Sequence, residues 1–279
     1  MREYVSKVSW LEIFLWKLRR QKPLHRSDLF VHYPQVETLP QGFGIWLGHA
    51  SFYVRIGGKG LLFDPVFGDI PFHKRLTPLP IDPKALKVDL VLISHGHYDH
   101  LDLASLRMLD APCIVPRGLG KYLRFKEVVE LEWWEEIEFE GLKIAALPAK
   151  HWHRRTLFDT NRALWASFLV ENLYFAGDSA YADHFKKIGA EFRIDTALLP
   201  IGAYEPRHIM KENHMNPQEA YRAFLDLEAK RFIPYHYGAF ILSDEPVDEP
   251  LRRIERLAKG DSRIHIVQPG EPFSIHPSK

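Results

Sequence analysis

The stretch SHGHYDHL constrains this chain more than any other part of it, because it gathers four potential metal ligands within six residues. These ligands are His95, His97, Asp99 and His100. Imidazole nitrogens and carboxylate oxygens are ligands that a hydrolytic zinc ion prefers, and a set without a thiolate suits a catalytic site better than a closed structural one. The segment directly before them, VDLVLI, is apolar and rich in β-branched residues, which predicts a buried strand. The candidate ligands therefore begin where a rigid strand ends.

Further candidate ligands follow other apolar segments in the same way. His151 and His153 come after KIAALPAK, Asp178 comes after LYFAG, and His236 comes after RFIPY. A single histidine after a strand is more often a hydrogen-bonded polar residue than a ligand. Four strand ends that each deliver His or Asp are difficult to explain by packing alone, so the pattern indicates one metal site assembled from distant segments.

The whole chain has the composition of a globular protein with one large domain. It has 279 residues, 46% of them hydrophobic, and a net charge of +1. A net charge this small is not the excess of positive charge that is typical of nucleic-acid-binding proteins, so we do not expect nucleic acid as a partner. Cys113 is the only cysteine, so the chain forms no internal disulfide. Because no apolar stretch is long enough to cross a membrane and no secretory signal is recognisable, we expect a cytoplasmic protein, with its oligomeric state open.

The order of the predicted elements indicates how the domain is built. Prolines interrupt residues 1–40, which we interpret as an N-terminal extension of a domain at 41–279. Hairpins followed by alternating helices and strands predict an α/β (α+β) fold, with two mixed β-sheets face to face and helices on the outer faces. The predicted strands are 45–56, 61–63, 88–93, 113–115, 134–139, 142–147, 163–170, 173–175, 196–200, 231–234 and 264–267, and the predicted helices are 119–125, 217–227 and one that begins near residue 103.

The ligand pattern resembles the metallo-β-lactamase superfamily, whose His-x-His-x-Asp-His signature matches residues 95–100. The resemblance covers about residues 42–270 and implies a four-layer αβ/βα sandwich. It also implies two divalent metal ions, for which we expect zinc, with iron or manganese as alternatives. Each ion has its own ligands and one residue lies between them: His95, His97 and His151 hold the first, Asp99, His100 and His236 hold the second, and Asp178 is the bridge.

Other residues that match the family pattern receive supporting roles. We expect Asp64 to accept an N–H from a ligand and so fix its tautomer; the alternative is a turn residue before Pro65. His49 lies inside a predicted strand, and we expect it to be buried and hydrogen-bonded near the site. His153 remains an alternative to His151 as the ligand, because a shift of two residues keeps the same strand face.

The resemblance assigns catalytic roles to Asp99 and His214. His214 matches a position near the substrate phosphate, where an N–H would neutralise charge that develops on a phosphoryl oxygen. The alternative is a polar residue at the N-terminus of a helix. Arg154 and Arg155 are either contacts for an anionic substrate or surface charges.

Several motifs look like the branch of the superfamily that contains N-acylphosphatidylethanolamine-hydrolysing phospholipases D. They include WLGHASF, LLFDPVF, ISHGHYDHLD, HMNPQEA and PYHYGAF. Leu101 and Asp102 also stand where glyoxalase II and acyl-homoserine lactonases usually have a glycine. The resemblance therefore implies a dinuclear hydrolase that uses a metal-bridging hydroxide on a small-molecule or lipid phosphodiester. The ascorbate-6-phosphate lactonase branch shares much of the pattern, so a lactonase or esterase is the first alternative and a non-catalytic metal-binding protein is the second.

The segment WLEIFLWKLRR at 10–20 is very apolar and ends in a basic cluster. We favour a helix that packs on the main domain, because a helix lying in a membrane interface usually has a wider polar face. The alternative is peripheral contact with the inner face of a membrane. A lipid substrate would make this segment a docking helix.

Overall fold

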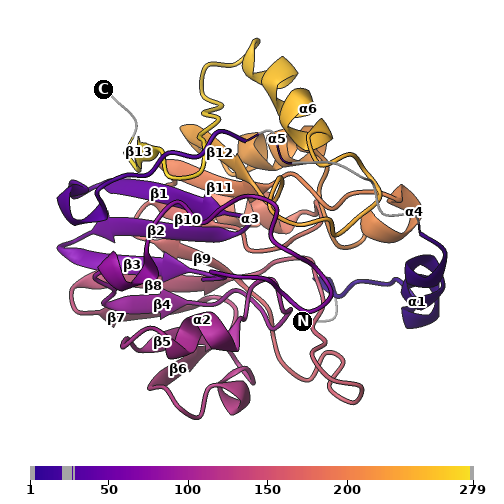
Figure 1. Ribbon diagram of the computed structural model, residues 1–279, viewed down its shortest axis with the longest axis horizontal. Helices are drawn as coiled ribbons and strands as arrows, with labels where there is room; N and C mark the ends of the chain where they lie inside the picture. The colour runs from indigo at the N-terminus through magenta and orange to yellow at the C-terminus, as the bar shows by residue number, and fades with distance from the viewer. Residues whose placement is uncertain (1–3, 21–26, 28, 277–279) are drawn as a thin grey trace.

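Two mixed β-sheets lie face to face, with helices on their outer sides (Figure 1). The computed structural model describes residues 4–20, 27 and 29–276. The predicted fold class is confirmed. The seven-stranded sheet has the order β13 (Pro272–Ser274), β1 (Phe43–Gly48), β2 (Ser51–Ile56), β3 (Lys59–Phe63), β4 (Leu90–Leu92), β5 (Cys113–Pro116) and β6 (Val128–Leu131). The six-stranded sheet has the order β12 (Arg231–Tyr235), β11 (Thr196–Pro200), β10 (Leu173–Phe175), β9 (Ser167–Val170), β8 (Leu142–Leu147) and β7 (Glu135–Phe139).

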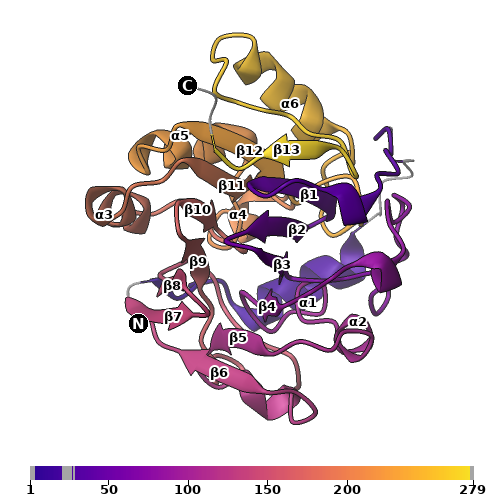
Figure 2. The ribbon, with the colours of Figure 1, turned by 90° about the vertical axis from the view of Figure 1, so that its left-hand side faces the viewer.

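Helices cover both outer faces of this pair of sheets. Seen after a 90° turn, α2 lies on one side and α3 and α5 lie on the other, with the strands between them (Figure 2). Helix α1 stands apart from them at the edge of the molecule (Figure 1). None of the helices in the described part of the chain has the length and apolar character needed to span a bilayer. The helices are α1 (Trp10–Arg19), α2 (Leu103–Arg107), α3 (His184–Glu191), α4 (Arg207–Met210), α5 (Pro217–Asp226) and α6 (Glu249–Ala258), with 3₁₀ turns at Val36–Thr38, Pro83–Ala85 and Gly120–Tyr122.

The alternation of side chains along the first strands creates two apolar layers. Trp46 and Phe52 face the second sheet and belong to the same cluster as Phe175. Their neighbours Leu47 and Tyr53 face the other way, into the cluster that contains the α2 residues. A sheet that is apolar on both faces must be covered on both, which explains why a helix packs on the outside.

Parallel strands bring one edge of each sheet to the same end of the molecule. β3, β4, β5 and β6 run parallel, and so do β10, β11 and β12. The segments that follow β3, β4, β10 and β12 carry Asp64, His95, Asp178 and His236 in turn. Because the carboxyl ends of parallel strands meet at one edge, side chains far apart in the sequence come together there.

Three predicted elements are wrong. The strand predicted at 45–56 is two strands, because Gly48 and His49 adopt positive φ angles of 94° and 54° and turn the chain between β1 and β2. The helix predicted at 119–125 is only a 3₁₀ turn. The segment 264–267 forms a single bridge, from Ile264 to Phe232 of β12. The last strand of the chain is instead β13, which pairs with β1 in the other sheet.

Other elements were not predicted. β6 has two exposed residues, Val129 and Glu130, and only Leu131 of its four residues is buried, so no buried run marks it. α3 and α6 derive their stability from apolar residues such as Phe185 and Ile254, which become buried only against the rest of the domain.

Candidate metal centre

Histidines and aspartates from seven separate segments converge where the two sheets meet. Within the described residues, four sets place ligand atoms within 4.8 Å of one another. The sets overlap, so they form one continuous cluster rather than four sites. They are His95, His97 and His151; His49, Asp99, His100 and His236; Asp64, His95 and His100; and His151, Asp178 and His214.

The first half of the cluster consists of three imidazoles. His97 Nδ1 lies 2.9 Å from His95 Nε2 and 3.2 Å from His151 Nε2. The Nε2 atoms of His95 and His151 each lie 3.9 Å from Asp178 Oδ2. Three nitrogens and one carboxylate oxygen therefore surround a common point.

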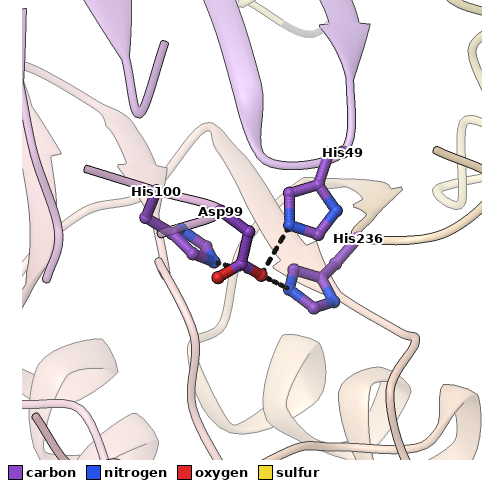
Figure 3. Close-up of side chains that lie close together, drawn as sticks. All are labelled: His49, Asp99, His100 and His236. Carbon is purple, nitrogen blue, oxygen red and sulfur yellow. Dashed lines mark hydrogen bonds and ion pairs between the residues drawn. The ribbon is translucent and has the colours of Figure 1, made fainter. Parts of the chain in front are cut away.

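The second half is built around Asp99, which lies between three imidazoles (Figure 3). Its Oδ2 atom is 3.0 Å from His49 Nε2, 3.7 Å from His100 Nε2 and 3.8 Å from His236 Nε2. Asp178 reaches this half as well, with Oδ2 3.2 Å from His100 Nε2 and Oδ1 3.1 Å from His236 Nε2. Asp178 is therefore the carboxylate that both halves share.

A second layer of hydrogen bonds orients the rings. Asp64 Oδ2 accepts from His100 Nδ1 at 2.6 Å and from Ser94 Oγ at 2.5 Å. Since Ser94 Oγ donates to Asp64, it accepts from His95 Nδ1, 2.9 Å away. His151 Nδ1 donates to the backbone carbonyl of Asn213 at 3.0 Å. In His95, His100 and His151 the hydrogen bond is made through Nδ1, so Nε2 is the nitrogen that faces the cluster, which is how metal-binding histidines are usually held.

The backbone of the site is strained at three residues. His49, Asp64 and His236 have φ angles of 54°, 40° and 70°, in the left-handed region that non-glycine residues rarely adopt. Such strain costs on the order of 1 to 3 kcal/mol for each residue and tends to persist at functional sites.

Burial keeps most of the imidazoles neutral. It lowers the pKa of His95 and His97 well below the ordinary value, and neighbouring imidazoles lower it further. Burial also lowers the pKa of His151 to about 3 and that of His214 to about 4. Neutral imidazole is the form that coordinates a metal, so these rings need not lose a proton before binding one.

His100 behaves in the opposite way. Burial disfavours its charge, but the carboxylates of Asp178, Asp99 and Asp64 outweigh that effect and hold its pKa well above the ordinary value. Burial would raise the pKa of Asp178, yet the imidazoles around it, His100 first, lower it well below the usual range. The cluster therefore stabilises positive charge at its centre.

The donor set fits divalent metal ions. Several buried donor atoms at the centre face one another without a hydrogen-bond partner among the described residues, as expected of atoms directed at a cation. Neutral imidazole and carboxylate together suit zinc, iron or manganese. The atoms are His100 Nε2, His214 Nδ1, His236 Nε2 and Asp178 Oδ1.

Two of the predicted residues occupy other positions. His153 is buried, but its Nε2 faces Tyr122 Oη at 3.3 Å and Asp159 at 4.0 Å, so the structure brings His151 and not His153 into the cluster. His49 is not inside a strand but in the turn between β1 and β2, where it is buried against Asp99. The turn, and not the alternation of side chains along a strand, directs the His49 ring toward the cluster.

The arginines that follow differ from each other. Arg155 donates to the backbone carbonyls of Gly96 and Leu101, at 3.1 and 2.7 Å, so it braces the ligand loop. Arg154 lines the pocket above the cluster. Neither the bracing role of Arg155 nor the hydrogen bonds of Ser94 and Asn213 were predicted from the sequence. Ser94 stands directly before the first ligand, and this position could have indicated its role. No sequence feature indicates that the carbonyl of Asn213 accepts from His151.

A pocket of about 630 Å³ opens above the cluster. Its floor includes His97, Asp99, Asp178 and His214. Its walls are mostly apolar and come from α1, the loop around residue 72 and the loop after His151. The apolar wall residues include Ile13, Phe14, Trp16, Phe72, Trp152 and Leu157.

Comparison with known proteins agrees with this architecture. The family model for the beta-lactamase superfamily domain matches residues 60–237. The chain is 40% identical over 242 residues to the mitochondrial N-acyl-phosphatidylethanolamine-hydrolyzing phospholipase D of Saccharomyces cerevisiae, which covers 78% of this chain and 52% of the yeast protein. The chain thus spans about half the length of that relative.

Two archaeal proteins match over nearly their whole length. A metal-dependent hydrolase of Methanopyrus kandleri is 31% identical, with 82% of this chain and 97% of that protein covered. The solved structure of a metallo hydrolase from Ignicoccus hospitalis superposes with a TM-score of 0.65 at 24% identity, covering 83% of this chain and 97% of that one. The structural match supports the fold, while the family model at 60–237 spans every residue of the cluster except His49.

Proposed function

The chain belongs to the beta-lactamase superfamily, and on this premise we propose that it is a metal-dependent hydrolase that cleaves phosphodiesters at a dinuclear site. The observation that carries the proposal is the position of Asp178, whose two oxygens face imidazoles of both halves of the cluster. A carboxylate shared between two sets of nitrogens is what a two-metal site requires. Divalent ions bound there would lower the pKa of a water nucleophile and polarise the substrate oxygen.

The residues of the chain have separable tasks in this reaction. His95, His97 and His151 would hold one ion, and Asp99, His100 and His236 the other. Asp64 keeps His100 in the tautomer whose Nε2 faces the cluster. His214 lines the pocket with Nδ1 3.8 Å from Asp178 Oδ2. From this position a ring N–H would donate to a phosphoryl oxygen on which negative charge develops.

The pocket supports a substrate that is both anionic and apolar. Lys17, Arg154 and Arg155 contribute positive charge to its lining, while most of the wall is apolar. The yeast relative is named for hydrolysis of N-acyl-phosphatidylethanolamine, a lipid phosphodiester. We propose a small-molecule or lipid phosphodiester as the substrate of this chain, without assigning that particular lipid.

Metal analysis combined with two kinetic assays tests the proposal. We expect purified protein to carry close to two metal ions per chain and to hydrolyse bis(p-nitrophenyl) phosphate, with activity lost on chelation and restored by zinc, iron or manganese. A much higher kcat/KM for a lactone than for the phosphodiester would replace this assignment with a lactonase. Metal-loaded protein that is inert toward phosphodiesters, lactones and esters would indicate a non-catalytic metal-binding role.

We propose that the protein is cytoplasmic and makes peripheral contact with a membrane surface. Exposed apolar side chains near the pocket support this contact. Leu11, Leu15 and Leu18 recur at intervals of four and three residues, so they form one stripe on α1. Phe72 and Phe158, from two other segments, are 94% and 81% exposed. Apolar residues grouped beside a pocket mouth are typical of surfaces that bind partners or lipid.

Vesicle co-sedimentation tests this contact. We expect intact protein to bind vesicles of phosphatidylcholine and phosphatidylglycerol, and the double variant Leu18→Ser with Phe158→Ser to bind at least about 5-fold more weakly. Leu225→Ser is the matched control, because Leu225 is 44% exposed on α5, away from the pocket lining. Equal binding by the double variant and the control would remove membrane contact from the proposal.

A further inference from the structure

Helix α1 is tied to the domain on both sides, next to the cluster. Before the helix, Ser6 N donates to the carbonyl of His151 at 3.0 Å, and His151 N donates to the carbonyl of Tyr4 at 3.2 Å. At its end, Trp16 Nε1 donates to Asp244 at 2.6 Å. The N-terminal segment therefore pairs with the backbone of a candidate ligand and then reaches the loop that follows β12.

Arg20 strengthens the second attachment. Its guanidinium donates to the carbonyls of Leu242 and Ser243, both at 2.7 Å, and lies 3.3 Å from Asp244 Oδ1. It also stacks over the Trp16 ring at 4.8 Å. Two attachments fix both the position of α1 and its rotation about its own axis.

This rotation turns a defined face of α1 into the pocket. Ile13, Trp16 and Lys17 are three and four residues apart, so they share one side of the helix, and all three line the pocket. Lys17 is the cation among the residues that α1 contributes to the lining. Its flexible apolar stem can lie along the wall while the ammonium faces the pocket.

The ammonium of Lys17 lies within the electrostatic reach of the cluster. Burial lowers the pKa of Lys17, while the carboxylate of Asp99 opposes that shift and Arg154 adds to it. Lys17 and Arg154 thus bring like charges toward the same space from different segments. Like charges brought together in a pocket favour an anionic ligand between them.

We propose that α1 is a substrate-recognition element of this pocket and that Lys17 binds an anionic oxygen of the substrate. The proposal rests on the proposed function, because it concerns the same site and the same class of substrate. It adds a specificity-determining residue from a segment that lies outside the matched family domain at 60–237.

Binding of inorganic phosphate to the metal-loaded full chain, measured by calorimetry, tests the proposal without depending on turnover. We expect Lys17→Met to raise the Kd for phosphate by about 10-fold, since one charge-assisted hydrogen bond is lost. Lys17→Arg should keep most of the affinity. Arg19→Met is the matched control, because it removes the same charge from the same helix at a residue outside the pocket lining.

Kinetics give a second readout. The ratio of kcat/KM for bis(p-nitrophenyl) phosphate to kcat/KM for the neutral ester p-nitrophenyl acetate should fall by about 10-fold in Lys17→Met, mainly through KM for the anion. Wild-type protein that binds phosphate but hydrolyses no phosphodiester would refute the proposed function and leave the Lys17 contact to be judged by calorimetry. Phosphate affinity that is equal in wild type and Lys17→Met, or reduced to the same extent by Arg19→Met, would overturn the inference.

Discussion

The floor and the rim of the pocket are built in different ways. The floor belongs to the metal-ligand cluster, in which His100 and His151 have no exposed surface and each ring has its Nδ1 atom fixed by a hydrogen bond. On the rim, Phe72 and Leu157 are 94% and 73% exposed. Chemistry at the floor requires each donor atom to be held in one direction, whereas the rim only needs to present apolar surface and charge.

This difference has an energetic basis. A buried polar group without its partner costs about 1 to 3 kcal/mol, so one change on the floor disturbs its neighbours. An exposed side chain on the rim has few neighbours, and its replacement usually changes stability by less than about 0.5 kcal/mol. Substitutions on the floor should therefore affect metal binding, and substitutions on the rim should affect substrate and surface contacts.

The largest effect should come from Asp178→Asn. This change keeps the size of the side chain but removes the negative charge that faces both halves of the cluster. Residues that only support metal ligands already cost 10- to 100-fold when changed, so we expect activity to fall by at least about 100-fold. Metal content measured by mass spectrometry should fall in parallel. Full metal content in Asp178→Asn would show that the two halves do not depend on a shared carboxylate.

His151 and His153 provide a matched pair two residues apart. His151→Asn removes an imidazole from the cluster and should lower metal content and activity together. His153→Asn removes a buried imidazole that faces Tyr122 and Asp159 instead. It should lower thermal stability but leave the metal content per folded chain unchanged. Loss of metal from His153→Asn alone would reverse the assignment of the ligand.

Asp64→Asn should have an intermediate effect. The amide can still accept a hydrogen bond from His100 Nδ1 but loses the charge that favours this tautomer. We expect metal affinity to fall by about 10- to 100-fold, measured by competition with a chelating dye. Asp82→Asn is the control, since the Asp82 side chain caps the 3₁₀ turn at Pro83–Ala85, outside the metal-ligand sets of the described residues. An affinity equal to that of the control would mean that Asp64 is a turn residue only.

Acid should weaken the floor before it affects the rim. In the metal-free protein, His49, His151 and His214 have pKa values of about 3, 3 and 4, because burial disfavours the charged ring. These histidines bind protons near pH 6.5 in the unfolded chain, so their stabilising contribution is complete above that pH and is lost progressively as the pH falls from there toward 3. His100, with its raised pKa, opposes the trend. We expect calorimetry in the presence of a chelator to show a lower Tm at pH 5 than at pH 7; a higher Tm at pH 5 would contradict the neutral state of the cluster.

The smallest effect should come from Phe158→Ser on the rim. The ring is 81% exposed, so its removal leaves no cavity. The free energy of unfolding, measured with urea, should stay within about 0.5 kcal/mol of the wild-type value. A loss above 2 kcal/mol would show that the rim is packed as the floor is.

Much of the floor could be predicted from the sequence because its residues are marked locally. His95, His97, Asp99 and His100 are adjacent in the sequence and follow a recognisable buried strand. His151, Asp178 and His236 each follow an apolar run, so their convergence could be expected from the way parallel strands align. The turn at His49 was missed because the apolar pattern continues through it, and only the positive φ angles of Gly48 and His49 break the strand.

The rim could not be predicted in the same way. No sequence pattern connects Lys17 with Asp99. The hydrogen bond that orients α1 joins Trp16 to Asp244, which lies 228 residues further along the chain. The helix itself was expected at 10–20, but the side it presents to the pocket depends on those distant contacts.

The sequence by itself determined the type of chemistry, because ligand identity and the strands that carry the ligands are local properties of the chain. It also determined the fold class, through the order of hairpins, helices and apolar strands. Only the tertiary structure decided which of two neighbouring histidines joins the cluster and which residues line the pocket above it. These choices depend on directions in space set by turns and by contacts between distant segments, and hydrophobic periodicity carries no information about either.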